Sequence, residues 1–282
     1  MIRIRARFAW LALTLLPALA QAAGYKFTSF QYPGASGTIF TGVDDTNRMT
    51  GYATVGGNPL GIFVTAAGSL ATINPPGSVS SMPKAINRIG GIVGTAYDGT
   101  NYSMFQDNGL GFGPITDLLF NQDVTGINAS FNFVGNFTSP SLEPAIYVVL
   151  QGVYNYLYPT RCIYTHDPAI NDSNMVVGNC VTERNTSLVF TWKNGRFTYY
   201  TPPSNMLYVQ ATGINKAGVV VGWYNDSSGL DHGFVLDAGV FSTVDNPAGP
   251  NTQIWGINKA GKLVGNVFTD YNSPTAFTAT PQ

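Results

Sequence analysis

The sequence predicts an all-β fold built from six repeated units, and three observations support this prediction. One motif occurs six times: a Gly or Ala, an Ile or Val, an Asn or Asp, and a Gly seven positions after the Asn or Asp. The copies recur every 41–44 residues, a period typical of repeated supersecondary units. The 32 Gly and 17 Pro disfavour helical repeats, and no window carries the apolar stripe of an amphipathic helix. The Asn or Asp positions are Asp44, Asn87, Asn128, Asn171, Asn215 and Asn258, and the glycines are Gly51, Gly94, Gly135, Gly178, Gly222 and Gly265.

Each unit is expected to form four short antiparallel strands. In residues 196–239 the β-like runs are 196–201, 209–215, 219–224 and 233–236, separated by turn-forming stretches at 202–205, 215–218 and 225–231. Four strands of this length, with their turns, fill one repeat. Six such units favour a six-bladed β-propeller, in which radial repetition leaves only short, protected sheet edges. A β-solenoid is the alternative, although its coils are usually shorter and carry fewer strands.

The turn after each Asn or Asp has a physical cause. An Asn or Asp side chain accepts backbone hydrogen bonds within a turn, and the residue three positions later favours a left-handed conformation. Five of those six residues are Gly or Asn, which tolerate positive φ. Phe131 is the exception, and we expect Asn132 to take its place in a longer turn. The small residue before each Ile or Val, and the Gly seven positions after each Asn or Asp, indicate a place where strands converge.

The two ends of the chain predict how the ring closes. Residues 25–30 match the first run of the unit described above (196–201), which is its outer strand, and residues 276–280 match the fourth run (233–236). The last unit therefore lacks an outer strand that the N-terminal segment offers. We expect residues 25–31 to pair with residues 275–280.

Residues 1–22 have the pattern of a secretory signal peptide. A basic start is followed by a short apolar run over residues 8–19 and by cleavage sites at Ala20-Gln21-Ala22 or Ala18-Leu19-Ala20. The apolar run is shorter than the roughly 20 residues that span a bilayer. The sequence thus predicts a signal peptide over 1–22, one propeller domain over 23–282, and a periplasmic or extracellular monomer with no transmembrane segment after cleavage.

Charge restricts the class of partner. Without the three Arg of the signal peptide, 11 basic residues face 15 acidic ones, which gives a net charge of −4. A protein that binds phosphate backbones needs a basic surface, so we expect no nucleic-acid partner.

Cys162 and Cys180 are the only two cysteines, and both lie in the fourth unit. In an oxidising compartment such a pair forms a disulfide by default. A turn centred on residues 172–173 would bring the two positions together across a hairpin, to within a few residues. The absence of a C-x-x-C pattern disfavours a metal or redox role.

The last two units resemble a known family. Residues 213–224 (GINKAGVVVGWY), followed by His232-Gly233-Phe234, are similar to the repeats of the HAF family of extracellular repeat proteins, as are residues 256–265 (GINKAGKLVG). The resemblance covers about residues 25–282 and is close only in these two units. It implies export and a repeat architecture, and it implies no particular activity.

Binding is the function that the sequence favours. The connections after the first and third runs of each unit share one face, and they are longer and more varied than the others. Tyr and Trp beside Asp and Asn suit stacking and hydrogen bonding to a glycan, and they suit protein contacts equally. The alternative is that these rings belong to the blade core. The expected ligand-binding residues are Tyr97, Tyr102, Trp223, Tyr224, Asp226, His232 and Tyr271.

Catalytic and metal motifs are weak. The sequence holds no G-x-S-x-G nucleophile elbow and no pair of His at zinc-ligand spacing, and its two glutamates lie in different units. The oxygen-rich loops 98–101, 225–228 and 270–272 lack the alternating spacing of a calcium loop. We therefore expect no cofactor and no catalytic residue. A polysaccharide hydrolase or lyase is the second hypothesis, to be judged by whether two carboxylates meet in one pocket at the channel mouth. A structural envelope protein is the third.

Overall fold

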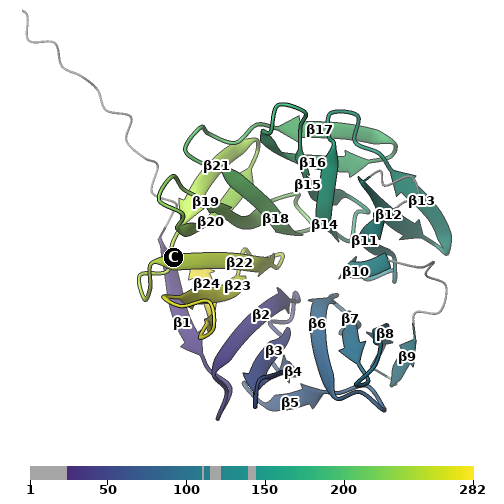
Figure 1. The fold of residues 1–282 in the computed structure, drawn as a ribbon, viewed down its shortest axis with the longest axis vertical. Helices are drawn as coiled ribbons and strands as arrows, with labels where there is room; N and C mark the ends of the chain where they lie inside the picture. The colour runs from purple at the N-terminus through teal and green to yellow at the C-terminus, as the bar shows by residue number, and fades with distance from the viewer. Residues whose placement is uncertain (1–23, 110, 115–121, 139–143) are drawn as a thin grey trace, which may run out of the picture.

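The computed structural model describes residues 24–109, 111–114, 122–138 and 144–282; the predicted signal peptide lies outside these residues. The described residues form 24 strands and no helix. Figure 1 shows these strands as six sheets arranged in a ring. Each sheet has four antiparallel strands, so the predicted six-bladed β-propeller is confirmed. Among the described residues, none lies in a helix of the length and apolarity that crossing a membrane requires.

The six blades are numbered here in chain order, each from its innermost strand outward. Blades 1 to 3 are β2 (Gly37–Val43), β3 (Met49–Val55), β4 (Asn58–Val64), β5 (Leu70–Ile73); β6 (Ser80–Ile86), β7 (Ile92–Tyr97), β8 (Tyr102–Asp107), β9 (Phe112–Pro114); and β10 (Gln122–Ile127), β11 (Phe133–Thr138), β12 (Pro144–Leu150), β13 (Val153–Leu157). Blades 4 and 5 are β14 (Tyr164–Ile170), β15 (Val176–Val181), β16 (Ser187–Lys193), β17 (Arg196–Tyr200); and β18 (Tyr208–Ile214), β19 (Val220–Asn225), β20 (Asp231–Asp237), β21 (Val240–Val244). Blade 6 is β22 (Asn251–Ile257), β23 (Leu263–Phe268), β24 (Thr275–Pro281) and, as its outer strand, β1 (Tyr25–Phe30).

Blade 6 closes the ring as predicted. Strand β1 pairs antiparallel with β24, from Tyr25 opposite Pro281 to Phe30 opposite Ala276. Figure 1 shows the purple N-terminal strand beside the yellow C-terminal strand. The Phe27 ring meets the Phe277 ring edge-on at 5.3 Å. Ring closure therefore rests on ladder hydrogen bonds together with aromatic packing.

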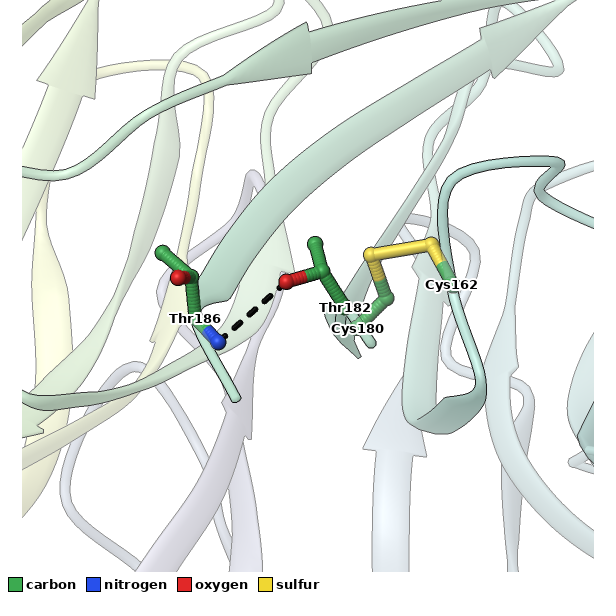
Figure 2. The surroundings of a disulfide bond; sticks show 4 residues. All are labelled: Cys162, Cys180, Thr182 and Thr186. Atoms are coloured by element: carbon green, nitrogen blue, oxygen red, sulfur yellow. Dashed lines mark hydrogen bonds between the residues drawn. A yellow bond between two sulfur atoms is a disulfide. The ribbon is translucent and has the colours of Figure 1, made fainter. Parts of the chain in front are cut away.

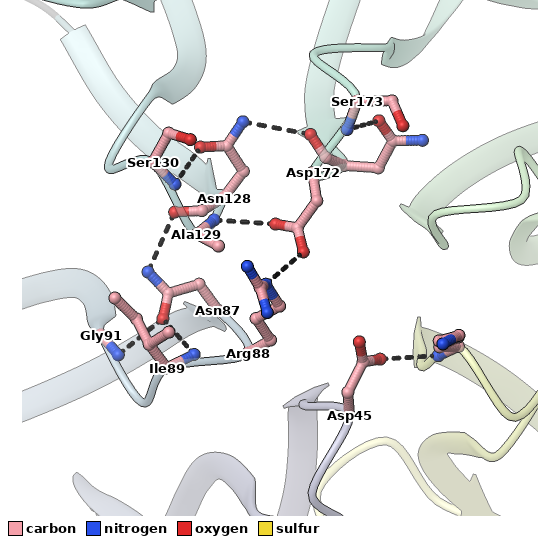
Figure 3. A network of polar contacts seen from close by, with 12 residues as sticks. Asp45, Asn87, Arg88, Ile89, Gly91, Asn128, Ala129, Ser130, Asp172 and Ser173 are labelled. Atoms are coloured by element: carbon pink, nitrogen blue, oxygen red, sulfur yellow. Dashed lines mark hydrogen bonds and ion pairs between the residues drawn. The ribbon is translucent and has the colours of Figure 1, made fainter.

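The repeated Asn links each blade to the next. Its Oδ1 accepts the N–H groups two and four residues later, and its Nδ2 donates to the backbone carbonyl of the equivalent residue in the following blade. Figure 3 shows two of these contacts, from Asn87 and from Asn128. The acceptor carbonyls belong to Asn128, Asn171, Asn215, Asn258 and Asp44, at 2.8–3.3 Å. Asp44 has no amide to donate; its carboxylate binds Arg48 instead, and Arg48 donates to the carbonyl of Arg88 in blade 2.

The expected turn at Phe131 is wrong in one respect. Phe131 itself takes the left-handed conformation, with φ of 54°, as do the residues at the equivalent position in the other five blades. Asn132 is free for another role: its Nδ2 donates to Asn174 of blade 4, and its Oδ1 accepts the N–H of Gln151. Positive φ at the bulky Phe131 costs free energy, and the two hydrogen bonds of the Asn132 side chain offset part of that cost.

The small residues mark where strands converge, as predicted. A Cβ on Gly51 would collide with the carbonyl oxygen of Ile39 on the innermost strand of the same blade. A Cβ on Gly213 would lie 3.2 Å from the Cα of Gly256 in the next blade. Small residues therefore let the six innermost strands approach one another around the axis.

The predicted disulfide between Cys162 and Cys180 is present, with Cα atoms 5.4 Å apart (Figure 2). Cys162 lies in the connection between blades 3 and 4, and Cys180 lies on β15. The bond ties the segment just before the innermost strand of blade 4 to the second strand of the same blade. It therefore restrains the start of β14.

Candidate ligand-binding site at the channel mouth

Two kinds of connection share one end of the central channel. Each innermost strand runs toward its Asn turn, so the connections between blades, and those between the second and third strands, lie at the opposite end. Residues 31–36, 158–163, 201–207 and 269–274 are among them. This is the face with the longer connections, called here the long-loop face, and the first residues of the innermost strands border its channel mouth.

An aromatic run crosses from blade 4 to blade 5 at this mouth. Tyr164 and Tyr208 begin β14 and β18, and they expose 55% and 39% of their surface. The His166 ring lies between them, 5.5 Å from the Tyr164 ring and 6.0 Å from the Tyr208 ring, which is stacked parallel to it. The Tyr208 hydroxyl lies 3.3 Å from His166 Nε2, and Trp223 packs 5.7 Å behind Tyr208. The mouth thus presents two exposed rings held in place by two others.

Below the aromatic run, β14 carries an irregularity that the other innermost strands lack. The register of β14 against β15 skips two residues, Asp167 and Pro168, where β18 skips only Thr212. Asp167 takes a positive φ of 46°. Such bulges with strained residues often redirect a side chain toward a functional site.

Amide groups of both neighbouring blades hold the Asp167 carboxylate. Asn136 Nδ2 of blade 3 donates to its Oδ1 at 3.1 Å, and Gln210 Nε2 of blade 5 donates to its Oδ2 at 2.7 Å. The backbone N–H of Asp167 donates in turn to Asn136 Oδ1 at 2.8 Å. Burial alone would raise the pKa of Asp167, but hydrogen bonds from His166 and Asn136 outweigh burial and hold the pKa below its usual range. Asp167 is therefore a carboxylate at neutral pH.

A cavity of about 160 Å³ lies in the channel beside Asp167. Most of its lining comes from positions three and five before the repeated Asn of each blade. The lining residues are Ile39, Thr41, Tyr52, Met82, Lys84, Thr125, Asp167, Pro168, Thr212 and Trp255. Thr41, Thr125 and Thr212 use their hydroxyl groups to bind carbonyls of the next blade. Lys84 occupies the same position in blade 2 and brings a half-buried ammonium group into the channel.

Asp123 of blade 3 is a second carboxyl group on an innermost strand. It holds the position five before the repeated Asn, where Ile39 and Met82 line the cavity in blades 1 and 2. Its Oδ1 is buried and has no hydrogen-bond partner among the described residues. Burial raises the pKa of Asp123; the charge of Lys84 opposes this rise, and the charge of Asp167 adds to it. Two carboxyl groups with opposite pKa shifts therefore lie on the innermost strands of neighbouring blades; Asp167 lines the cavity, and Asp123 does not.

Three of the predicted binding residues gather in blade 5. The His232 ring stacks on Tyr224 at 5.1 Å, its Nδ1 lies 2.8 Å from Asp245, and its Nε2 lies 3.4 Å from Asp226. Burial lowers the pKa of His232, but Asp245 and Asp226 outweigh burial and raise it. Tyr224 is buried within the core cluster of blades 4 and 5, which agrees with the alternative of a core ring. His232 thus ties two long connections together.

The remaining predicted residues are dispersed. Trp223 joins the aromatic run, and its Nε1 is buried without a partner among the described residues. Tyr271 is 65% exposed and donates its hydroxyl to the buried Asp231 at 3.2 Å. Tyr97 and Tyr102 pair with each other at 4.7 Å in blade 2, away from this group. Whether these residues bind a ligand stays a prediction.

The oxygen-rich loops use their carboxylates within their own turns. Asp98 accepts the N–H groups of Thr100 and Asn101, both at 2.7 Å. Asp226 accepts the N–H groups of Ser228 and Leu230 in the same way. These carboxylates act as turn formers, as their spacing indicated.

Sequence reasoning missed Tyr164, His166, Tyr208, Asp123, Asp167 and Lys84 as site residues, and had placed His166 in a structural role. Their common signal is position: each lies three to seven residues before a repeated Asn, on the strand that borders the channel. Because the chemistry at these positions differs from blade to blade, no repeated motif marks them.

Comparison with known proteins establishes the fold alone. No family model matches the chain, and no curated protein matches it. A virginiamycin B lyase structure from Staphylococcus aureus is similar over 91% of this chain and 99% of its own, with a TM-score of 0.57 and 12% identity. A gluconolactonase from Xanthomonas campestris is similar over 92% and 90%, with a TM-score of 0.57 and 10% identity. TolB from Acinetobacter baumannii is similar over 86% of this chain and 55% of its own, with a TM-score of 0.56 and 11% identity.

Proposed function

We propose that this protein is an exported β-propeller binding module whose ligand is a glycan, held at the channel mouth of the long-loop face over blades 4 and 5. The observation that carries the proposal is the aromatic run, in which the exposed Tyr164 and Tyr208 rings flank His166, next to Asp167 and the cavity that Asp167 lines. Aromatic rings offer apolar faces on which sugar rings stack, and a few polar groups beside them orient the ligand.

Charged and amide side chains in the channel favour a glycan over a protein partner at this mouth. A protein interface usually centres on a packed apolar patch with a polar rim. Here Gln210 and Asp167 follow the aromatic run on β18 and β14, and Lys84 lines the same cavity as Asp167. Hydroxyl-rich ligands match such groups, whereas apolar side chains of a protein would leave them unpaired.

The proposal includes export and membership of the HAF-type extracellular repeat proteins. The signal-like residues 1–22 and the disulfide support export. The similar structures include a protein named as a lyase, one named as a gluconolactonase, and TolB. One fold carries several functions, so the channel mouth of this protein, and not its fold, supports the proposed function.

A glycan array tests the proposal. Residues 23–282 are compared with the double variant Tyr164→Ala/Tyr208→Ala, and Tyr102→Ala serves as the control because it removes an exposed Tyr at a distant site, in blade 2. Selective binding that the double variant loses and the control keeps supports the proposal. Binding lost only in the Tyr102 variant would move the site to blade 2. No binding to any glycan would overturn the proposal and favour a protein partner or a structural envelope role.

A second candidate function is hydrolysis of the bound glycan. Asp167 lines the cavity, and Asp123, on the innermost strand of the neighbouring blade, lies near enough for the Asp167 charge to raise its pKa. In this step the Asp167 carboxylate takes a proton from water, and the water oxygen bonds to the anomeric carbon. The bond from that carbon to the glycosidic oxygen breaks, and the Asp123 carboxyl group gives its proton to this oxygen. The raised pKa of Asp123 and the lowered pKa of Asp167 suit the acid and the base. Release of reducing ends by the wild type, lost in both Asp167→Asn and Asp123→Asn, would support hydrolysis; no release from any glycan bound on the array would exclude it.

A further inference from the structure

The channel cavity below the aromatic run contains a cation without a partner. Among the residues that the structure describes, the Lys84 ammonium has no hydrogen-bond or ion-pair partner, although it is half-buried. Asp123 and Asp167 lie near enough for its charge to lower the pKa of both. A partly buried charge is costly unless a partner completes its hydrogen bonds. Lys84 therefore leaves three N–H donors for a ligand.

Asp167, which lines the same cavity, offers the complementary acceptor. A carboxylate has about four acceptor positions. Asn136 and Gln210 occupy one on each oxygen, and His166 Nδ1 lies at the longer distance of 3.5 Å. The amides orient the carboxylate and leave it capacity for a further donor. Every innermost strand carries a bulge at this level, but Asp167 is the one bulge residue that takes a positive φ among the described residues.

The chemistry that fits both groups is a hydroxyl. A hydroxyl donates one hydrogen bond and accepts others, so neighbouring hydroxyls of a sugar can bind an ammonium and a carboxylate together. Trp255, Tyr52 and Met82 supply apolar lining against which a sugar ring can pack. The cavity of about 160 Å³ is smaller than the roughly 300–1,000 Å³ of pockets that enclose a drug-sized ligand. It therefore has room for one end of a glycan and not for a length of chain.

We propose that this cavity is the deep subsite of the glycan site, and that it takes a single terminal sugar unit whose hydroxyl groups bridge the Lys84 ammonium and the Asp167 carboxylate. This inference rests on the proposed glycan function and adds that the protein recognises chain ends. The aromatic run would hold the units that follow, outside the channel.

The indole N–H signals of three tryptophans test this inference by NMR. Trp223 lies behind the aromatic run, Trp255 lines the cavity, and Trp192 is buried in blade 4 as an internal reference. Trp223→Phe and Trp255→Phe assign the signals. The probes are free hexoses, pentoses, N-acetylhexosamines and hexuronates, followed by the oligosaccharides that bind on the array. We expect a monosaccharide to shift Trp255, a bound oligosaccharide to shift Trp223 and Trp255 together, and Trp192 to stay unchanged.

Matched variants distinguish the two proposals. Lys84→Met should weaken the monosaccharide affinity measured from the Trp255 signal about tenfold, because the variant loses the ammonium group and keeps a side chain of similar length. Lys216→Met, at the opposite end of the channel, should leave the response unchanged. Shifts of Trp223 without Trp255 would overturn the deep subsite and leave the glycan function intact. Shifts of Trp255 alone would overturn the binding role of the mouth, and no shift with any sugar would overturn both.

Discussion

At the residue scale, the repeated Asn explains why the motif recurs in every blade. Its side-chain Oδ1 accepts the backbone hydrogen bonds that order the turn, and its side-chain Nδ2 donates the hydrogen bond that joins this turn to the next blade. Neither Asp nor Ala can do both, because Asp lacks the donor and Ala lacks both groups. Asp44 nevertheless occupies this position in blade 1, and Arg48 supplies the missing donor through its contacts with Asp44 and with the carbonyl of Arg88.

Two variants test whether Asp44 and Arg48 together do in blade 1 what a single Asn does in the other five blades. Arg48→Ala should lower the free energy of unfolding by about 2 kcal/mol, because it leaves a buried carboxylate without its charged partner. Adding Asp44→Asn should restore most of this loss, because the Asn amide can reach blade 2 as it does in the other five blades. Urea denaturation of the wild type, both single variants and the double variant measures the coupling. Additive losses would show that Arg48 does not replace the amide.

Asp123 predicts a pH dependence of stability. Burial raises its pKa in the folded state, so the folded protein holds this proton more tightly than the unfolded chain does. The protonated Asp123 therefore stabilises the folded protein fully at a pH below the pKa that this group has in the unfolded chain. This stabilisation is lost as the pH rises through the higher pKa of the folded state. Asp123→Asn removes the charge, so it should raise the melting temperature at pH 7, by about 2–4 °C for each kcal/mol gained. The gain should vanish at pH 3, and an equal gain at both pH values would contradict this explanation.

At the scale of elements, the disulfide and the bulge both act on β14. Cys162 ties the start of this strand to β15, and the skipped pair Asp167 and Pro168 turns the carboxylate toward the channel. Tyr164 and His166 lie between these two features. The positions of these site residues therefore depend on β14, which the disulfide restrains just before its first residue and the bulge bends within the strand.

Loss of the disulfide should affect both stability and binding. Cys162→Ser/Cys180→Ser opens a loop whose ends are 18 residues apart; a bond closing a loop of this size contributes about 3 kcal/mol to the free energy of unfolding. Glycan affinity should also fall, because Tyr164 begins only two residues after Cys162. Chemical denaturation and binding measurements on the wild type, with and without reductant, provide the comparison. Unchanged affinity in the reduced protein would separate the disulfide from the site.

The elements were predictable from the sequence to a greater extent than the site was. Strand positions, the disulfide and the pairing of β1 with β24 follow from turn residues, spacing and the match between chain ends. The site lies on the same strands, but the residues that face the channel are those three and five positions before each Asn, and they are different in every blade, as Thr41, Lys84 and Trp255 illustrate. All six innermost strands carry a bulge at this level, but in β14 the unpaired stretch includes both Asp167 and Pro168, and Asp167 takes a positive φ. A local change of backbone conformation of this kind leaves no pattern that alternation could reveal.

At the scale of the whole molecule, each blade packs its core against the next, so we expect closure of the ring to stabilise all six blades. One core cluster joins Ala169, Val177 and Val189 of blade 4 to Val209 and Phe234 of blade 5. Another joins Phe40 and Ile62 of blade 1 to Val264 and Ala276 of blade 6. Both ends of the chain meet in blade 6, which therefore holds the whole ring together.

Ring closure is tested on β1. Phe27→Asp should lower the free energy of unfolding by about 2 kcal/mol, because it removes a half-buried ring from Phe277 and weakens the cover of the β24 edge. Thr28→Asp, which adds the same charge at an exposed position of the same strand, should have little effect. Size-exclusion chromatography should also detect association of the Phe27 variant through the uncovered edge. Equal stability of the two variants would contradict closure by β1.

The most direct test of the central claim is the affinity of Tyr208→Ala for the glycan that the wild type binds best on the array, measured by titration calorimetry beside Tyr102→Ala. A ligand held at the channel mouth of blades 4 and 5 predicts a loss of about tenfold or more for Tyr208→Ala, equal to about 1.4 kcal/mol, and no loss for Tyr102→Ala. Equal affinity of Tyr208→Ala and the wild type would contradict a binding site at this mouth.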